Sequence, residues 1–430
     1  MFVKKDVLWF IIYKIVLDLT YIYIHKDLFG YYGFGFTLNI SKQIISWGLF
    51  IIVVVCISSK AINCRTLFLY TTMCLGLTPT FIYYEYNTEA KTWMLLVQVI
   101  MLLITDILMN KVGLFGNVKI KKISYSSQLV RFLAGFILII YFVYTFMQYG
   151  MPVFDLLSFE NVGIIRENSS ISTLMGIVQN LICKILGPIL MMILFFKKKW
   201  ISFLLVLIVQ LYTYAITGFK TFLFIPVVII ALLVFHKVDI NRLMLRALPI
   251  VCICCNLIYL LLDESYPYAL INERVLFLPA KIKFAYFDYF SKHEFVLFSQ
   301  STIGTLFGLE SSYTQSIPNL IGAVYFNKPE MWTNTGFMAD AYSNMGIIGM
   351  LLIAVFLSSI LSLIDASLKG NNPKLNRGIM GMFLLFFISL NDGSAITVFF
   401  SGGMIFALFL VCIISFKDID NSRKIKNNMK

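Results

Sequence analysis

The chain has 430 residues, of which 59% are hydrophobic and only 13% are charged, and its mean hydropathy is +0.85. Soluble domains carry about 25% charged residues to cover their exterior, so this composition excludes a string of soluble domains and indicates a polytopic membrane protein. The net charge of +13 is compatible with nucleic-acid binding or with the positive-inside bias of membrane proteins, and the positions of the basic residues decide between them.

Apolar segments of roughly bilayer-spanning length follow one another along the chain. They cover residues 7–24, 40–58, 67–84, 92–109, 129–149, 173–196, 200–217, 221–235, 244–262, 336–364, 378–391 and 395–415. We therefore expect an all-α fold with about twelve transmembrane helices. The shortest segment, 378–391, ends at the turn-forming cluster Asn391-Asp392-Gly393-Ser394, which would allow a tight hairpin with the last span.

Basic residues gather in alternate loops. With the N-terminus inside, about 22 of them fall in cytoplasmic loops and about ten in external loops, as the positive-inside rule requires. Both termini are then cytoplasmic, and nucleic acid is excluded as a partner because no clustered basic face is needed to account for the charge. Inside the first span, Lys14 and Asp18 are spaced to pair at i,i+4.

The predicted domains follow from these spans. Residues 1–262 hold nine spans and a short external loop at 150–172, residues 263–335 form a long external loop, residues 336–415 hold the last three spans, and residues 416–430 form a basic cytoplasmic tail. Loops longer than about 15 residues are usually functional or disordered, and the aromatic content of this one opposes disorder. Its segment 280–298 interleaves Phe and Tyr with Lys and predicts an interfacial helix, which either anchors the loop or lines the path of a lipid-linked substrate.

Basic residues in external loops run against the charge bias, and the prominent ones are Arg166, Lys220 and Arg274. Lys220 lies in a very tight turn between two spans, where an unpartnered cation is costly. A phosphate would be a suitable partner, since Arg binds it bidentately and Lys acts as a point charge. Pairing with nearby glutamates or with lipid headgroups is the alternative.

The end of the long loop returns to the membrane with polar residues at the head of a helix. Asp340 and Asn344 share one face because they are four residues apart, and Tyr342 lies between them. The carboxylate either stabilises the helix N-terminus through the dipole or faces a cavity as a base or sugar-binding group. His25 and His236 are expected to be ordinary surface histidines.

This segment reads Asn334-x-Gly336-Phe337-x-Ala339-Asp340-Ala341-Tyr342-x-Asn344-x-Gly346. Together with the layout of spans around one late external loop, it resembles bacterial O-antigen or capsular repeat-unit polymerases of the Wzy type. The stretch Arg274…Pro279…Tyr286-Phe287-Asp288-Tyr289-Phe290 is similar to the start of their long loop, and Pro318-x-x-Ile321-Gly322 to its later part.

The resemblance implies a GT-C-like glycosyltransferase of the bacterial inner membrane. One undecaprenyl-pyrophosphate-linked oligosaccharide would be the donor and another the acceptor, with a flippase and a chain-length regulator as further partners. No nucleotide sugar, cofactor or metal is expected, and Cys252-x-Cys254-Cys255 is interpreted as packing within a span.

The chemistry assigns roles to the residues already named. Arg166, Lys220 and Arg274 would stabilise the pyrophosphate as charge develops on it. Asp340 is the preferred base for the acceptor hydroxyl and His293 the second choice. The predicted glycan-binding residues are Tyr313, Asn334, Tyr342 and Asn344.

Two membrane proteins of the same pathway are alternatives, and an ion-coupled transporter is a third. A lipid-linked oligosaccharide flippase of the Wzx type shares the spans and the basic charge, but needs cations within a central cavity and has short loops. An O-antigen ligase would use an external histidine. An ion-coupled transporter should show internal repeats, which this sequence lacks.

Overall fold

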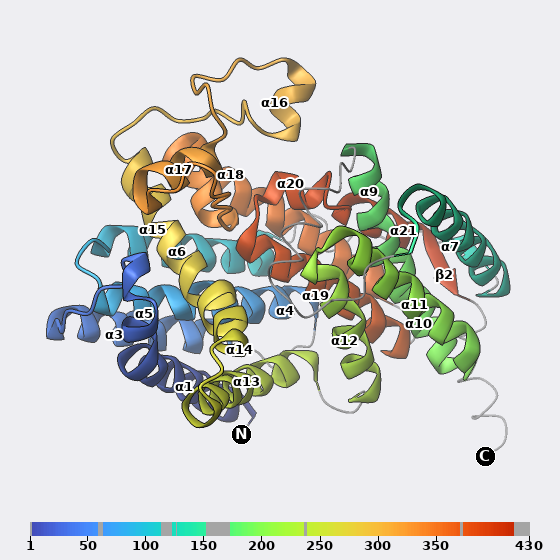
Figure 1. The fold of residues 1–430 in the computed structure, drawn as a ribbon, viewed down its shortest axis with the longest axis horizontal. Coiled ribbons are helices and arrows are strands. Elements are labelled where there is room, and N and C mark those ends of the chain that lie inside the picture. Colours follow the sequence, from blue (N-terminus) through green and yellow to red (C-terminus); the bar gives the residue numbers. More distant parts are fainter. Residues whose placement is uncertain are drawn as a thin grey trace. The chain divides into compact units, whose positions relative to one another are not determined.

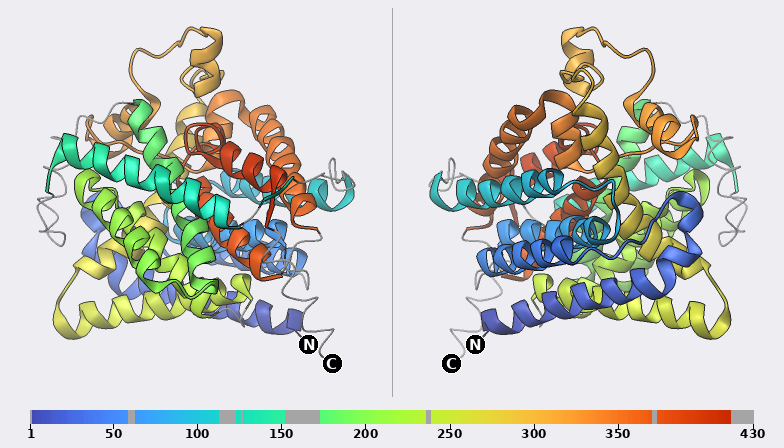
Figure 2. Two further views of the ribbon diagram at one scale, coloured as in Figure 1. Left: turned by 90° about the vertical axis from the view of Figure 1, so that its right-hand side faces the viewer. Right: turned by 90° about the vertical axis from the view of Figure 1, so that its left-hand side faces the viewer.

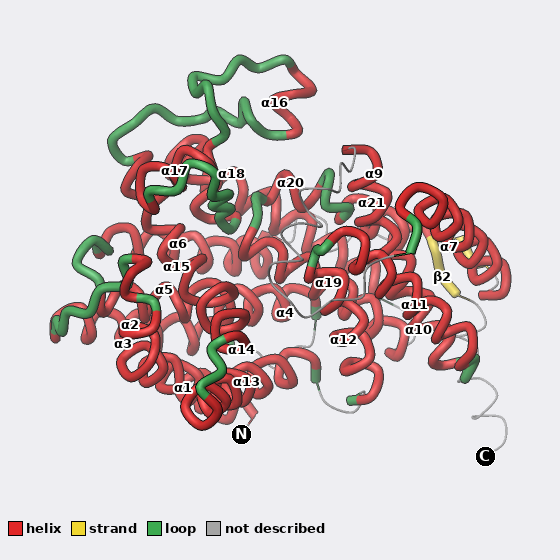
Figure 3. The backbone as a smooth tube through the Cα atoms, viewed as in Figure 1, coloured by secondary structure: helices red, strands yellow, loops and turns green. Residues whose placement is uncertain are grey.

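The computed structural model describes residues 2–58, 63–112, 123–125, 127–151, 173–235, 239–369 and 373–416. Helices dominate these residues, as the red tube in Figure 3 shows. Within the described part, strands are confined to one parallel ladder, in which β1 (Ile123–Tyr125) pairs with β2 (Ile414–Phe416). The prediction of a helical polytopic protein is therefore confirmed, with this short ladder as an addition.

Nine helical stretches in the described part are long and apolar enough to cross a membrane. They are Lys5–Leu28, Ile40–Ile57, Cys64–Tyr86, Thr92–Asn110, Arg131–Tyr149, Met175–Phe196, Trp200–Thr217, Ile240–Leu262 and Phe337–Leu368. All nine coincide with predicted spans.

The other three predicted spans are not among these nine helices. The apolar part of α12 (Lys220–Val234) covers only Phe222–Val234 and contains Pro226. The last predicted span is divided into α20 (Ala395–Phe399) and α21 (Met404–Ile413), because Gly403 adopts a positive φ of 95° between them. The helix α19 (Pro373–Asp392) is not among the nine either. The total of twelve spans stays a prediction.

The chain divides into two compact units. The first comprises residues 1–117, 239–365 and 387–398, and the second comprises 118–238, 366–386 and 399–430. The first unit is built from α1 (Phe2–Thr20), α2 (Lys26–Leu28), α3 (Ile40–Ile57), α4 (Cys64–Thr71), α5 (Thr78–Tyr86), α6 (Thr92–Ile107), α13 (Ile240–Leu262), most of α18 (Phe337–Leu368) and the long loop. Most of these helices are labelled in Figure 1. The second contains α7 (Ser127–Tyr149), α9 (Thr173–Leu181), α10 (Gly187–Phe196), α11 (Trp200–Thr217), α12 and α21.

In the part of the chain that the structure describes, five π-helical stretches interrupt these helices. They are η1 (Tyr21–His25), η3 (Thr72–Leu77), η4 (Leu108–Val112), η5 (Ile182–Leu186) and η6 (Ala269–Phe277). A π turn releases backbone carbonyls from the regular helical ladder, and side chains from other helices bond to several of them. Tyr13 donates to the carbonyl of Cys74 at 3.0 Å, Gln210 to that of Cys183 at 3.2 Å and Arg65 to that of Met109 at 3.1 Å.

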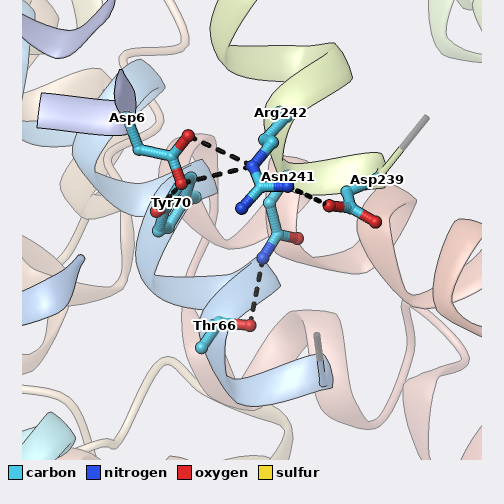
Figure 4. Close-up of polar contacts among 6 residues, drawn as sticks. All are labelled: Asp6, Thr66, Tyr70, Asp239, Asn241 and Arg242. Carbon is cyan, nitrogen blue, oxygen red and sulfur yellow. Dashed lines mark hydrogen bonds and ion pairs between the residues drawn. The ribbon is translucent and has the colours of Figure 1, made fainter. Parts of the chain in front are cut away.

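A polar network joins α1, α4 and α13 (Figure 4). Arg242 lies 3.2 Å from Asp6 and 2.5 Å from Asp239, and the Tyr70 hydroxyl donates to Asp6 at 3.1 Å. Asn241 donates to the Thr66 hydroxyl at 3.0 Å. The guanidinium is thus neutralised by two carboxylates, one near the start of α1 and one directly before α13.

A second ionic cluster is buried between the spans. The Lys14 ammonium contacts the carboxylates of Asp18, at 3.4 Å, and of Glu85, and it lies 4.1 Å from the centre of the Trp47 ring. Lys14 is 0% and Glu85 1% exposed, so the charges neutralise one another rather than being solvated. The predicted Lys14–Asp18 pair is confirmed, and Glu85 is its unpredicted third member.

The expectation of a surface histidine at position 25 is wrong. His25 is fully buried, its ring lies 4.3 Å from that of Phe34 and 4.4 Å from that of Phe277, and neither ring nitrogen has a hydrogen-bond partner. The π-helical turn η1 rotates this end of the first span inward. His236 lies outside the described residues.

The long loop is structured, with α14 (Tyr266–Tyr268), η6, α15 (Leu278–Phe290), α16 (Thr302–Phe307) and α17 (Ile317–Phe326). The segment carrying α16 projects away from α15 and α17 in Figures 1 and 2. The prediction of an interfacial helix over 280–298 is wrong in position and in extent. The helix ends at Phe290, and Lys281 and Lys283 on it are 7% and 3% exposed, because α15 packs inside the first unit against α5 and η3.

Candidate functional site

The head of α18 lies against the turn at the end of α19. A Cβ atom built on Gly336 would lie 2.4 Å from the carbonyl oxygen of Asn391. Real Cβ atoms do not approach a carbonyl oxygen so closely, so glycine is the residue that permits this backbone contact. The contact joins the 334–346 motif to the Asn391-Asp392-Gly393-Ser394 turn, two segments that the sequence analysis treated separately.

The helix α18 is broken within the same motif. Met345 (φ −150°) and Gly346 (φ 60°) leave helical geometry, so the residues from Phe337 to Asn344 form a separate short helix. Asn344 fixes this break, because its carbonyl oxygen accepts from the Phe298 amide at 2.7 Å and its amide donates to the carbonyl of Asp340 at 2.8 Å. Both polar atoms of the predicted glycan-binding residue Asn344 are therefore engaged with backbone.

Lys283 of α15 lies near the contact between Gly336 and Asn391, although it is distant from both residues in the sequence. Its ammonium donates to the Gly76 carbonyl of η3 at 3.0 Å. Burial lowers the pKa of Lys283 to about 8, and the nearby Asp392 carboxylate opposes that shift. A buried ammonium with a lowered pKa beside a carboxylate is typical of functional sites, and also of structural ion pairs.

Asp340 completes this group of side chains. Its carboxylate interacts with the Ser394 hydroxyl. Asp340 is half-buried and Asp392 is exposed, whereas Asn391 and Lys283 are buried. Hereafter the polar centre means Lys283, Asp340, Asn391, Asp392 and Ser394. It offers an ammonium that can stabilise developing negative charge and carboxylates that can accept a proton.

Tyr286 connects α15 to the loop before α18. Its hydroxyl donates to the Thr333 carbonyl at 3.0 Å. Burial and the nearby Asp340 carboxylate raise the pKa of Tyr286 well above its usual range. The phenol therefore stays protonated and acts as a hydrogen-bond donor beside the polar centre.

His293 and Tyr313 belong to a different cluster. The His293 ring stacks on Tyr289 at 3.9 Å, and its Nδ1 lies 2.8 Å from the carbonyl oxygen of Tyr289. Tyr313 donates to the carbonyl of Glu294 at 2.5 Å. One ring nitrogen of His293, the second choice of base, is thus engaged by a backbone carbonyl near the end of α15.

Tyr342 and Asn334 lie on either side of Asp340 in the sequence but in different surroundings. Tyr342 is 8% exposed and its ring packs 4.5 Å from that of Phe287 and 6.0 Å from that of Trp93. Asn334 is exposed. Their predicted glycan contacts stay predictions.

The three predicted pyrophosphate-binding residues lie in different parts of the chain, and only the side chain of Arg274 is described. Arg274 is exposed on η6, 3.9 Å from the Glu273 carboxylate. Burial raises the pKa of Glu273 to about 7, and Arg274 opposes that shift. Lys220 is the first residue of α12 in the second unit, and its side chain lies outside the described part. Arg166 lies outside the described residues.

Lys283 and Asp392 are not among the site residues that the sequence predicts. Lys283 was assigned to the lipid headgroups because its neighbours are aromatic, and Asp392 was interpreted only as part of a turn. The usable signal was the Asp392 carboxylate at the end of an apolar segment that returns to the membrane, where a charge needs a partner.

Comparison of the chain with protein-family models, with curated proteins and with solved structures finds no match. A proposal for its function therefore rests on the resemblance of the 334–346 motif and on the geometry of the polar centre.

Proposed function

We propose that the protein polymerises undecaprenyl-pyrophosphate-linked oligosaccharide repeat units into O-antigen or capsular polysaccharide on the outer face of the bacterial inner membrane. The observation that carries the proposal is the polar centre, in which Asp340 of the polymerase-like motif shares one region with Lys283 of the long loop. Glycosyl transfer to a hydroxyl requires both a proton acceptor and a cationic group.

The proposed reaction is a glycosyl transfer from one lipid-linked oligosaccharide to another. The acceptor hydroxyl attacks the anomeric carbon of the donor, the bond from that carbon to the pyrophosphate oxygen breaks, and the hydroxyl proton passes to Asp340. The leaving pyrophosphate gains negative charge, which Lys283 and Arg274 stabilise within the first unit. Arg166 and Lys220 retain their proposed role as further pyrophosphate ligands. Asp392 positions the Lys283 ammonium.

The flippase alternative would draw support from Lys14, a cation buried among the spans. That ammonium is already neutralised by Asp18 and Glu85, which makes it a poor ligand for a lipid-linked pyrophosphate. The ligase alternative relies on an external histidine, and His293 is held by Tyr289.

Deletion of the gene followed by glycan profiling separates these functions. Loss of a polymerase leaves lipid that carries a single repeat unit, loss of a flippase leaves no surface glycan, and loss of a ligase leaves polymer on carrier lipid. An unchanged glycan ladder would overturn all three.

The site is tested by complementation of the deletion strain. Asp340→Asn and Arg274→Ala should each abolish chain extension at unchanged protein level, whereas Glu310→Gln, an exposed loop variant, should extend chains normally. Full extension by Asp340→Asn removes the proposed base.

A further inference from the structure

A cavity of about 300 Å³ with charged groups in its lining lies within the first unit, between the loop after α5, α15 and α17. We propose that it binds a sugar unit. Its lining combines the aromatic rings of Tyr83, Phe284 and Tyr325 with the carboxylates of Glu89 and Asp288 and the ammonium groups of Lys91 and Lys281. None of these residues belongs to the polar centre or to the predicted glycan-binding set.

The edge that carries Glu89 and Lys91 is held firmly in place. The Lys42 ammonium donates to the backbone carbonyls of Asn87 at 2.6 Å and of Ala90 at 2.7 Å. The Asn87 side chain accepts from the Gly35 amide at 2.9 Å and donates to the Tyr21 hydroxyl at 2.8 Å. The loop is therefore fixed before any ligand arrives, which lowers the entropic cost of binding.

Asp288 is oriented by two hydrogen-bond donors and one ion pair. Lys292 lies 2.8 Å, the Tyr325 hydroxyl 2.8 Å and the Lys91 ammonium 3.6 Å from its carboxylate oxygens. Burial tends to raise the pKa of Asp288, but the bonds from Lys292 and Tyr325 outweigh it and hold the pKa below its usual range. A fixed, ionised carboxylate is a strong acceptor for hydroxyl groups.

The aromatic lining supplies the complementary apolar surface. The rings of Tyr83 and Phe284 lie 5.4 Å apart and are tilted by 31°. A sugar ring presents C–H groups on its faces and hydroxyls around its edge, so it needs an apolar wall together with a rim of donors and acceptors. A few placed polar groups in an aromatic-lined cavity of a few hundred Å³ are typical of small-molecule sites.

Other ligand classes fit this cavity poorly. A phosphate would face the repulsion of two carboxylates, while the cations nearby are occupied: Lys91 and Lys292 by Asp288, and Lys281 by the Tyr32 carbonyl. An acyl chain would have to strip water from four charged groups at great cost. A neutral, hydroxyl-rich ligand satisfies the charged groups without either penalty.

The helix α15 contributes side chains both to the cavity and to the polar centre. Lys281, Phe284 and Asp288 follow one another at helical spacing on the cavity face, whereas Lys283 and Tyr286 are turned by about half a revolution toward the polar centre. One helix thus separates the sugar site from the reacting groups. This inference rests on the proposed function, since it assigns the cavity to the glycan of a lipid-linked substrate.

The test measures binding without turnover. Full-length protein, purified in a detergent that has no sugar headgroup, is examined by saturation-transfer difference NMR with glucose, galactose, N-acetylglucosamine and N-acetylgalactosamine. Inorganic pyrophosphate, observed by phosphorus NMR, is the competing probe. At least one sugar should give a saturable signal, and Glu89→Gln and Asp288→Asn should each weaken it about tenfold, the effect of losing one charged hydrogen bond. Glu310→Gln is the matched control.

The outcomes separate the cavity from the polymerase. No sugar signal, equal signals in wild type and both folded variants, or pyrophosphate binding that the two variants abolish overturns the sugar site. Thermal midpoints of the variants show whether they fold. An unchanged ladder on gene deletion overturns the polymerase, while variant-sensitive sugar binding would still establish the cavity. Loss of the ladder with wild-type binding in both variants overturns the cavity alone.

Discussion

At the scale of single residues, Lys14 is the charge whose removal we expect to cost the most stability. Lys14→Met leaves Asp18 and Glu85 as uncompensated carboxylates between spans, and loss of one partner of a buried ion pair typically costs about 3–5 kcal/mol. The thermal midpoint of the purified protein should fall sharply, whereas Lys5→Met, at an exposed position on the same helix, should leave it unchanged.

A double variant tests the cause of that loss. Adding Glu85→Gln to Lys14→Met removes one of the unpaired carboxylates and should restore part of the midpoint. Equal midpoints for the Lys14→Met chain and the wild type would contradict the buried ion cluster.

Lys283 predicts how activity and stability depend on pH. Because its pKa is about 8 in the folded protein and about 10.4 in an unfolded chain, the folded chain loses this proton first as pH rises. Between these two values the unfolded state binds more protons, so this group makes the folded state more stable as pH rises. Chain extension needs the ammonium and should fall as pH passes about 8.

The charge-preserving variant separates the two effects. Lys283→Arg stays protonated, so the alkaline loss of extension should move to higher pH in membranes that contain it. Lys328→Arg, at an exposed position, should keep the wild-type profile. If chain extension falls at the same alkaline pH in the wild type, Lys283→Arg and Lys328→Arg, Lys283 is excluded as the cause of that fall.

The sequence predicted some of these residues and missed others for a physical reason. Asp340 stands out because a carboxylate at the start of an apolar segment is costly. Lys283 does not, because interleaved lysines and aromatics suit both a headgroup helix and a buried one. The distinction depends on η3 and the 391–394 turn, which are distant in sequence.

At the scale of elements, the contact of α18 with the end of α19 depends on Gly336. Gly336→Ala would place a methyl group against the Asn391 carbonyl and force the motif away from the turn. We expect a loss of chain extension together with a lower thermal midpoint. Gly48→Ala in α3, where a Cβ meets nothing within 4 Å, should raise stability slightly through helix propensity. Similar results for both variants would contradict the close approach.

The sequence predicts a helix correctly where its apolar composition alone determines its position. It fails where the position depends on contacts with segments distant in the sequence. The nine long apolar helices follow from hydrophobic runs of spanning length. The enclosed position of α15 does not, since its sequence is compatible with a membrane surface. The π-helical turns carry no periodic signal, which is why the burial of His25 was missed.

At the scale of the whole molecule, the charge bias predicts which loops face outward. In a chain whose native cysteines are replaced by alanine, Glu310→Cys should react with a membrane-impermeant maleimide in intact spheroplasts. Lys199→Cys should react only after permeabilisation. Both positions are exposed. Labelling of Lys199→Cys in intact spheroplasts would reverse the predicted orientation.

The division into two units could not have been predicted from the sequence. The first unit takes residues from three separate stretches of the chain, and composition is similar throughout the spans. Contacts of α13 with α1 and α4, and of α15 with α5, join the first two of these stretches in the folded chain.

The π turn η3 has a mechanical consequence. Moving a π turn along a helix shifts the residues it passes by about one position, which amounts to a rotation of roughly 100°. Lys283 holds the Gly76 carbonyl within this turn, and Glu85 lies on the α5 helix that continues from it. Equal hydrogen exchange over residues 72–86 in the wild type and in Lys283→Met would contradict a linkage between them. Displacement of the Lys283 ammonium would free the Gly76 carbonyl to rejoin the helical ladder, and we expect the resulting rotation of α5 to move Glu85 relative to Lys14.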